Sequence, residues 1–175
     1  MLAKGKGAKK DTVKAKYYYQ DPQGRGDLVA TLYLSELHEK EKRLEKAEKL
    51  LREAMGRIEA IHGFVHPLMG QAYHQLARIF VASGRTDEAV QFYLKALKIR
   101  KASLGPENQY VAFSLNNLAN LFMDQGRYAE AEPLYQRSLT IYEKVLGPEH
   151  PYVATSLNDL ALLYSDLGRY SEAEK

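Results

Sequence analysis

The 175-residue sequence contains no cysteine and no tryptophan. Without cysteine, disulfide bonds, thiolate chemistry and cysteine-based zinc sites are excluded. No apolar run approaches the roughly 20 residues that a membrane-spanning helix needs. The lysine-rich beginning, MLAKGKGAKK, has no apolar stretch behind it of the kind that a secretory signal requires. We therefore expect a cytoplasmic location and no membrane partner.

The motifs of common catalytic and phosphate-binding sites are missing as well. The sequence contains no HExxH helix, Gly-rich phosphate loop or nucleophile elbow. His62 and His66 are four residues apart, but Gly63 between them and Pro67 after them interrupt the helix that a metal-binding pair would need. We therefore predict no catalytic residue, no metal site and no cofactor, and we do not expect an enzyme.

Positive charge is concentrated at the beginning of the chain. The formal net charge is +3, whereas residues 1–16 alone carry six lysines and one aspartate, so the remainder carries −2. Residues 1–26 predict a flexible basic arm, because few groups there could bury enough surface to offset the entropy of ordering. Asp27 is then placed to cap a following helix. Contact of the lysines with a polyanion such as nucleic acid is a minor alternative, since no nucleic-acid-binding fold accompanies them.

The rest of the chain is organised by a 42-residue repeat. Residues 108–133 match residues 150–175 at 16 of 26 positions, and residues 66–107 match 108–149 at 14 of 42. Self-similarity at a fixed period indicates stacked repeats. The predicted units are listed in chain order: a degenerate capping copy at 27–65, full repeats at 66–107 and 108–149, and a partial copy at 150–175.

Each copy predicts a helical hairpin. In the central copy, one helix runs from about Tyr110 to Asp124 and closes at Gly126, and a second runs from Tyr128 to about Val145. The first copy predicts two helices with a break near residues 41–43. Apolar and small residues at helical spacing predict the core of the central copy: Val111, Ala112, Leu115, Leu118, Ala119, Phe122, Ala131, Leu134, Tyr135, Ser138 and Tyr142.

The segments LNNLANLF and GRYAEAEPLYQRSLTIYEKVLGPEHP, together with the 42-residue period, resemble the tetratricopeptide repeat, specifically the long variety of kinesin light chains and many bacterial arrays. The resemblance is strong over residues 66–175 and loose over 28–65. It implies an all-α, right-handed superhelical solenoid of antiparallel helix hairpins with a concave, peptide-binding groove. The chain departs from the chaperone-binding type, because the matched positions supply one Arg, one His and no Lys.

In such arrays the polar face of the first helix of each hairpin lines the groove. Nine residues on this face are our candidate peptide-binding site: Gln71, His74, Arg78, Phe113, Asn116, Asn117, Asn120, Asn158 and Asp159. Asn is a poorer helix former than Glu, Lys or Gln, and its amide offers both donors and an acceptor. The repeated asparagines could therefore grip the backbone of an extended peptide.

Arg78 and His74 would add positive charge to this face and Phe113 an apolar pocket, which favours a peptide bearing an acidic group. Two other interpretations stay open. The face could simply be solvated, or its amides could bond one another between neighbouring helices. In either case the sequence does not identify the partner.

The functional prediction is a scaffold for a peptide or partner protein. An alternative is the sensor or assembly section of a larger enzyme or signalling protein. The last copy stops within its second helix, which would leave an apolar stripe uncovered. We therefore also expect self-association, giving a homo-oligomer, or fraying at that end.

Overall fold

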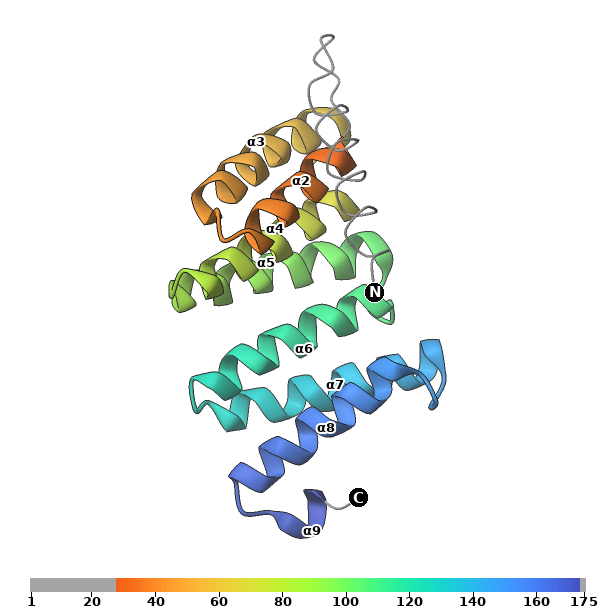
Figure 1. Ribbon diagram of the computed structural model, residues 1–175. Coiled ribbons are helices and arrows are strands. Elements are labelled where there is room, and N and C mark those ends of the chain that lie inside the picture. Colours follow the sequence, from red (N-terminus) through yellow and green to blue (C-terminus); the bar gives the residue numbers. More distant parts are fainter. Residues whose placement is uncertain (1–27, 174–175) are drawn as a thin grey trace, which may run out of the picture.

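The computed structural model describes residues 28–173, which form eight helices and the turns between them (Figure 1). The helices are α2 (Leu28–Lys40), α3 (Leu44–His62), α4 (Pro67–Ala82), α5 (Thr86–Leu104), α6 (Gln109–Asp124), α7 (Tyr128–Leu146), α8 (Pro151–Asp166) and α9 (Tyr170–Ala173). The predicted basic arm and the predicted cap at Asp27 lie outside the described residues. The predicted break near residues 41–43 is the turn between α2 and α3.

Successive helices pack in pairs, and the pairs stack one on another from α2 and α3 at one end of Figure 1 to α8 and α9 at the other. Within each pair the two helices make the most extensive contacts, and the second helix of a pair also packs on the first helix of the next. The predicted all-helical superhelical solenoid is confirmed.

The core follows the predicted stripe of the central repeat. Val111, Leu115, Leu118 and Phe122 on α6 are all buried, and the alanines beside them are fully covered. Burying a side chain of this size stabilises the fold by about 1.5–3 kcal/mol. Alanine has no bulk beyond Cβ, so neighbouring helices can approach closely at its positions. The stack is thus held mainly by apolar contact between adjacent hairpins.

The turn inside each of the three later hairpins is a Gly-Arg pair, whereas Lys42 takes the left-handed position in the first. Gly126 has a φ of 69°, the left-handed conformation that glycine adopts without the penalty that a Cβ brings. In the turn after α4, the backbone N–H of Arg85 donates to the carbonyl of Phe80 at 2.8 Å, and its guanidinium lies 4.1 Å from the Phe80 ring centroid. The Nε and Nη2 atoms of Arg85 also donate to the two carboxylate oxygens of Glu88, each at 2.6 Å. Each such arginine therefore closes its own hairpin.

Two of these arginines also reach the preceding hairpin. Arg85 Nη1 donates to Glu48 at 3.2 Å, and Arg169 Nη1 donates to Glu132 at 2.8 Å. Arg127 instead donates to Gln125 of its own turn, because the residue 42 positions after Glu48 is Val90. The carboxylate link between hairpins is therefore missing at the central junction.

Candidate functional site

Polar bridges join the first helices of neighbouring hairpins at two junctions. Ser35 Oγ donates to Gln75 Oε1 at 3.1 Å between α2 and α4. Asn116 Nδ2 donates to Asp159 Oδ2 at 2.9 Å between α6 and α8. At the junction between these two, that of α4 with α6, no such bridge forms between the described side chains: Asn117 Nδ2 instead donates to the backbone carbonyl oxygen of Phe113 in its own helix at 2.7 Å. The bridging group of α6 is thus turned away from α4.

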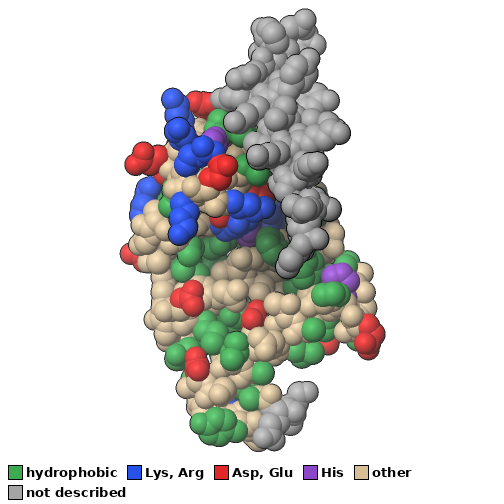
Figure 2. Space-filling model, viewed as in Figure 1, with side chains coloured by type: hydrophobic (Ala, Val, Ile, Leu, Met, Phe, Trp, Pro, Cys, Tyr) green, Lys and Arg blue, Asp and Glu red, His purple; other side chains and the backbone are tan. Residues whose placement is uncertain are grey.

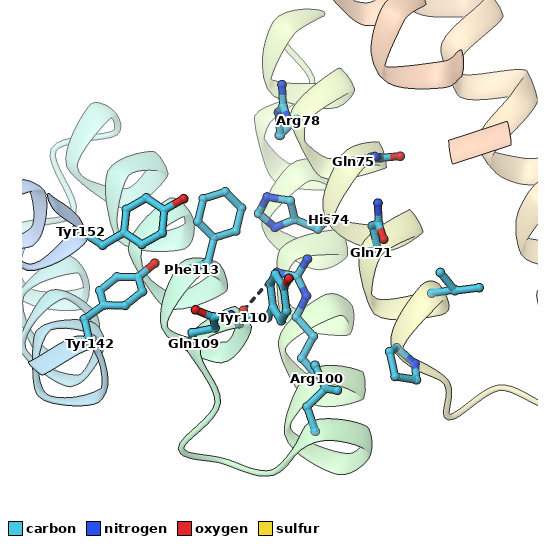
Figure 3. Close-up of a pocket in the computed structure, with 13 residues that line it drawn as sticks. Gln71, His74, Gln75, Arg78, Arg100, Gln109, Tyr110, Phe113, Tyr142 and Tyr152 are labelled. Carbon is cyan, nitrogen blue, oxygen red and sulfur yellow. Dashed lines mark hydrogen bonds between the residues drawn. The ribbon is translucent and has the colours of Figure 1, made fainter. Parts of the chain in front are cut away.

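A pocket of about 460 Å³ opens between α4 and α6 (Figure 3). These two helices approach each other less closely than α2 and α4 or α6 and α8 do. Its polar and aromatic lining comes from five helices: Gln71, His74, Gln75 and Arg78 of α4, Arg100 of α5, Gln109, Tyr110 and Phe113 of α6, Tyr142 of α7 and Tyr152 of α8. The volume lies within the range of roughly 300–1,000 Å³ that small ligand groups occupy.

His74 forms part of the pocket wall. Its side chain is 3% exposed, and its ring lies 4.8 Å from the ring of Phe113 and 5.2 Å from that of Tyr93. Among the described residues, neither ring nitrogen has a hydrogen-bond partner. Burial, together with the charges of Arg100 and Arg78, holds the pKa of His74 well below its usual value. His74 is therefore neutral, and the prediction that it adds positive charge is wrong.

Arg78 is already paired with an acid. Its Nη2 atom lies 2.8 Å from Glu39 Oε1 of α2. Burial raises the pKa of Glu39, although the neighbouring Arg78 acts in the opposite direction. The predicted charge of Arg78 is thus largely balanced within the chain.

Arg100 is the cation that the sequence interpretation missed. Its side chain is 5% exposed, and Nη1 donates to the carbonyl of Tyr110 at 3.1 Å and to Ser114 Oγ at 2.7 Å. No described Asp or Glu lies within ion-pair distance of it. Burial lowers the pKa of Arg100 to about 10, so the guanidinium is still protonated at neutral pH. The repeat itself contained a signal for this residue. The equivalent position 42 residues later is Tyr142, which is buried, so Arg100 occupies a position that is buried in the next repeat.

Gly70 makes room for this arginine. A Cβ at position 70 would lie 2.9 Å from Arg100 Cγ and 3.4 Å from Ile99 Cγ2. The guanidinium also lies 5.8 Å from the ring centroid of Tyr110. Figure 3 shows the end of the Arg100 side chain close to Tyr110, on the same side of the pocket as Gln71.

The structure separates the nine predicted site residues into two groups. Four of them line the pocket: Gln71, His74, Arg78 and Phe113. The others lie along α6 and α8, where Asn116 and Asp159 bind each other and the Asn120 carbonyl oxygen accepts a 2.5 Å hydrogen bond from the Tyr135 hydroxyl. Asn158 is exposed and borders a second hollow along α8. The amides of α6 thus bind other groups of the chain and not one another, which differs from the alternative that the sequence left open.

Charge is uneven along the array. Residues 28–107 contain 13 Lys and Arg against 10 Asp and Glu, whereas residues 108–173 contain 4 against 8. Figure 2 shows the Lys and Arg side chains of one face gathered mainly over its upper half. The pocket therefore lies between a basic half of the array and an acidic one.

The part of the chain that the structure describes contains no group of three or more His, Asp or Glu side chains placed to hold a metal ion. Over the same residues, no helix has the combination of length and apolar character that crossing a membrane requires.

The family model of the tetratricopeptide repeat matches residues 27–102 and 110–175. The chain therefore belongs to the tetratricopeptide repeat family, and it is a helical-repeat scaffold of the kind that mediates protein interactions. Folds of this family are typically non-catalytic.

Solved structures resemble the chain over most of its length. BtubC (BKLC) of P. vanneervenii is 32% identical with a TM-score of 0.79, over 95% of this chain and 66% of that one. The nearly identical TPR-like repeats of a Podosopora anserina kinesin light chain are 27% identical with a TM-score of 0.73, over 83% and 69% of the two chains. The predicted likeness to kinesin light chain repeats is confirmed.

Among curated relatives, the clustered mitochondria protein homolog of Coccidioides immitis is 29% identical over 73 residues. This match covers 42% of the present chain and 6% of the relative. The chain therefore corresponds to a small part of that protein.

Proposed function

We propose that the chain holds an extended peptide segment of a partner protein along α4, α6 and α8, with one side chain or terminus of that peptide in the pocket between α4 and α6. The observation that carries the proposal is the pocket itself, which has aromatic walls, amides at its rim and a buried arginine. An extended peptide held along these helices would leave few of its backbone polar groups unpaired, since amide side chains offer both donors and acceptors.

The free amides are the groups available to the peptide backbone. Gln71 lines the pocket and is half-buried, and Asn158 is exposed on α8. Asn116, Asn117 and Asn120 already bind groups of the chain, so they would have to exchange those partners on binding. We therefore assign the first contacts of the peptide to Gln71 and Asn158.

Selection of displayed random peptides on the purified chain, followed by fluorescence anisotropy of the selected peptides, tests the proposal. Replacing Gln71 by Ala removes a side chain at the pocket. Replacing Gln91 by Ala makes the same change at an exposed position of α5 and is the matched control. Losing one neutral hydrogen bond costs about 1 kcal/mol, or roughly fivefold in Kd.

We expect the peptides to bind Q71A roughly fivefold more weakly than the parent chain and to bind Q91A equally well. Equal binding to both variants, with unchanged helical melting curves, would place the peptide elsewhere on the array and refute the proposal.

A second proposal is that the array is the sensor or assembly section of a longer protein. It is favoured by the match to a short part of the clustered mitochondria protein homolog. Determining the surrounding reading frame tests it directly. An additional domain in the same frame would support this proposal, and a frame ending with this array would contradict it.

A further inference from the structure

We infer that the pocket between α4 and α6 is a carboxylate-binding site in which Arg100 is the anion receptor, and that the bound group carries an apolar body beside its carboxylate. This inference rests on the proposed peptide-binding function and names the chemistry of the group that enters the pocket.

The first argument is the state of Arg100. A guanidinium has five N–H donors, and the two hydrogen bonds of Arg100, to Tyr110 and Ser114, both use Nη1. The donors on Nε and Nη2 make no hydrogen bond to the described residues. A buried charge is costly unless it is paired, so an anion delivered to Arg100 recovers an interaction that the free chain lacks.

The second argument is that nearby acids are already bound. Glu39 of α2 binds Arg78, which lines the pocket. Glu107, in the turn after α5, binds Arg137 and Lys144. These carboxylates therefore do not balance Arg100, and an external anion would not have to displace them.

The third argument is the match of charge and shape. Arg100 carries one uncompensated positive charge, which a singly charged carboxylate balances, whereas a dianionic phosphate would leave excess negative charge in a largely apolar pocket. Tyr110, Phe113 and Tyr152 form aromatic walls. His74 is neutral, so the wall that it forms with Phe113 adds no charge beside Arg100.

The carboxylate could be the C-terminus of a peptide or an acidic side chain next to an apolar residue. Three probes separate these sources: N-acetylphenylalanine, its neutral amide, and N-acetyl-aspartyl-phenylalaninamide. Titration of each into the full chain is followed by the NMR signals of the pocket aromatic rings. We expect one or both carboxylates to bind roughly tenfold or more tightly than the neutral amide, because hydrogen bonds to charged groups are the stronger kind.

The matched variants are Arg100→Gln and Lys98→Gln. Both remove one positive charge from α5, but Lys98 is exposed. We expect R100Q to lose the preference for carboxylate over amide and K98Q to keep it. If R100Q does not fold, the comparison of carboxylate with amide on the parent chain decides the matter alone.

Equal binding of carboxylate and amide to the parent, or an unchanged preference in R100Q, overturns the inference. If selected peptides still bind the parent and lose affinity in the Gln71 variant, the proposed function stands without the carboxylate site. If the probes bind with the expected preference but no peptide is selected, the carboxylate site stands and the proposed peptide-binding function fails.

Discussion

Replacing Gly70 by Ala tests whether Arg100 is held where the pocket needs it. The residue lies near the beginning of α4 in a helical conformation that alanine also adopts, but its Cβ would lie 2.9 Å from Arg100 Cγ. Gly56 provides the matched control, because it lies inside α3 and a Cβ there would meet nothing within 4 Å. The same substitution is therefore made once with and once without the contact.

The two variants should change stability in opposite directions. Glycine inside a helix costs about 0.5–1 kcal/mol relative to alanine, so Gly56→Ala should stabilise the fold by that amount. Gly70→Ala makes the same gain but forces Arg100 to move. That movement weakens its hydrogen bonds to Tyr110 and Ser114, each made by a charged donor and worth about 1.5–3 kcal/mol. We expect a net loss of about 1–2 kcal/mol for Gly70→Ala.

Denaturation by urea, followed by far-ultraviolet circular dichroism, measures the difference between the two variants. Because repeat arrays depart from two-state unfolding, the midpoints should be compared with thermal midpoints. For a chain of this length, 1 kcal/mol corresponds to about 2–4 °C in Tm. If Gly70→Ala stabilises the chain as much as Gly56→Ala does, Arg100 is not fixed beside α4 and the reasoning about the pocket fails.

Three further predictions concern the pocket, the asparagines and α8. His74→Phe should stabilise the chain by about 1–3 kcal/mol in urea denaturation, because it removes two buried nitrogens without described partners. Since the pKa of His74 is depressed in the folded chain, only the unfolded chain takes up its proton as the pH falls below 6.5. The free energy of unfolding should therefore be constant above that pH and fall below it by up to about 1.4 kcal/mol per pH unit from this group, a loss absent from His74→Phe. Asn116→Ala should cost about 1 kcal/mol by the same assay, whereas Asn158→Ala should cost almost nothing, because only the former loses a hydrogen bond. Finally, Leu157 on α8 is 46% exposed, and we expect self-association that sedimentation detects at rising concentration and that Leu157→Gln weakens; identical monomeric sedimentation of both would contradict it.

Most of the fold follows from local sequence signals. The 3.6-residue apolar spacing specifies each helix, and turns such as Gly126 require a left-handed residue whatever the neighbouring repeat contains. The candidate site depends on contacts between repeats, which a helical wheel does not describe. The wheel places His74 and Phe113 on the faces of α4 and α6 that line the pocket, but it cannot show that their rings bury each other and so keep the imidazole neutral. Arg100 was missed because it lies on a second helix, away from the face expected to bind.

The polar links between hairpins explain why the pocket lies at the centre of the described array. The bridge between first helices is absent where Asn117 binds its own helix, and the carboxylate link between second helices is absent where Val90 replaces a glutamate. Among the described residues, the side-chain hydrogen bonds from α4 and α5 to α6 and α7 all come from Arg100.

A ligand held by Arg100 would therefore act on the junction at which the first helices of neighbouring hairpins approach each other least closely. Since local opening is easiest where few interactions cross a boundary, ligand binding should slow amide hydrogen exchange at the beginning of α6 more than at the beginning of α8. Equal slowing at both helices would mean that the ligand stabilises the array as a whole and that the central junction has no special role.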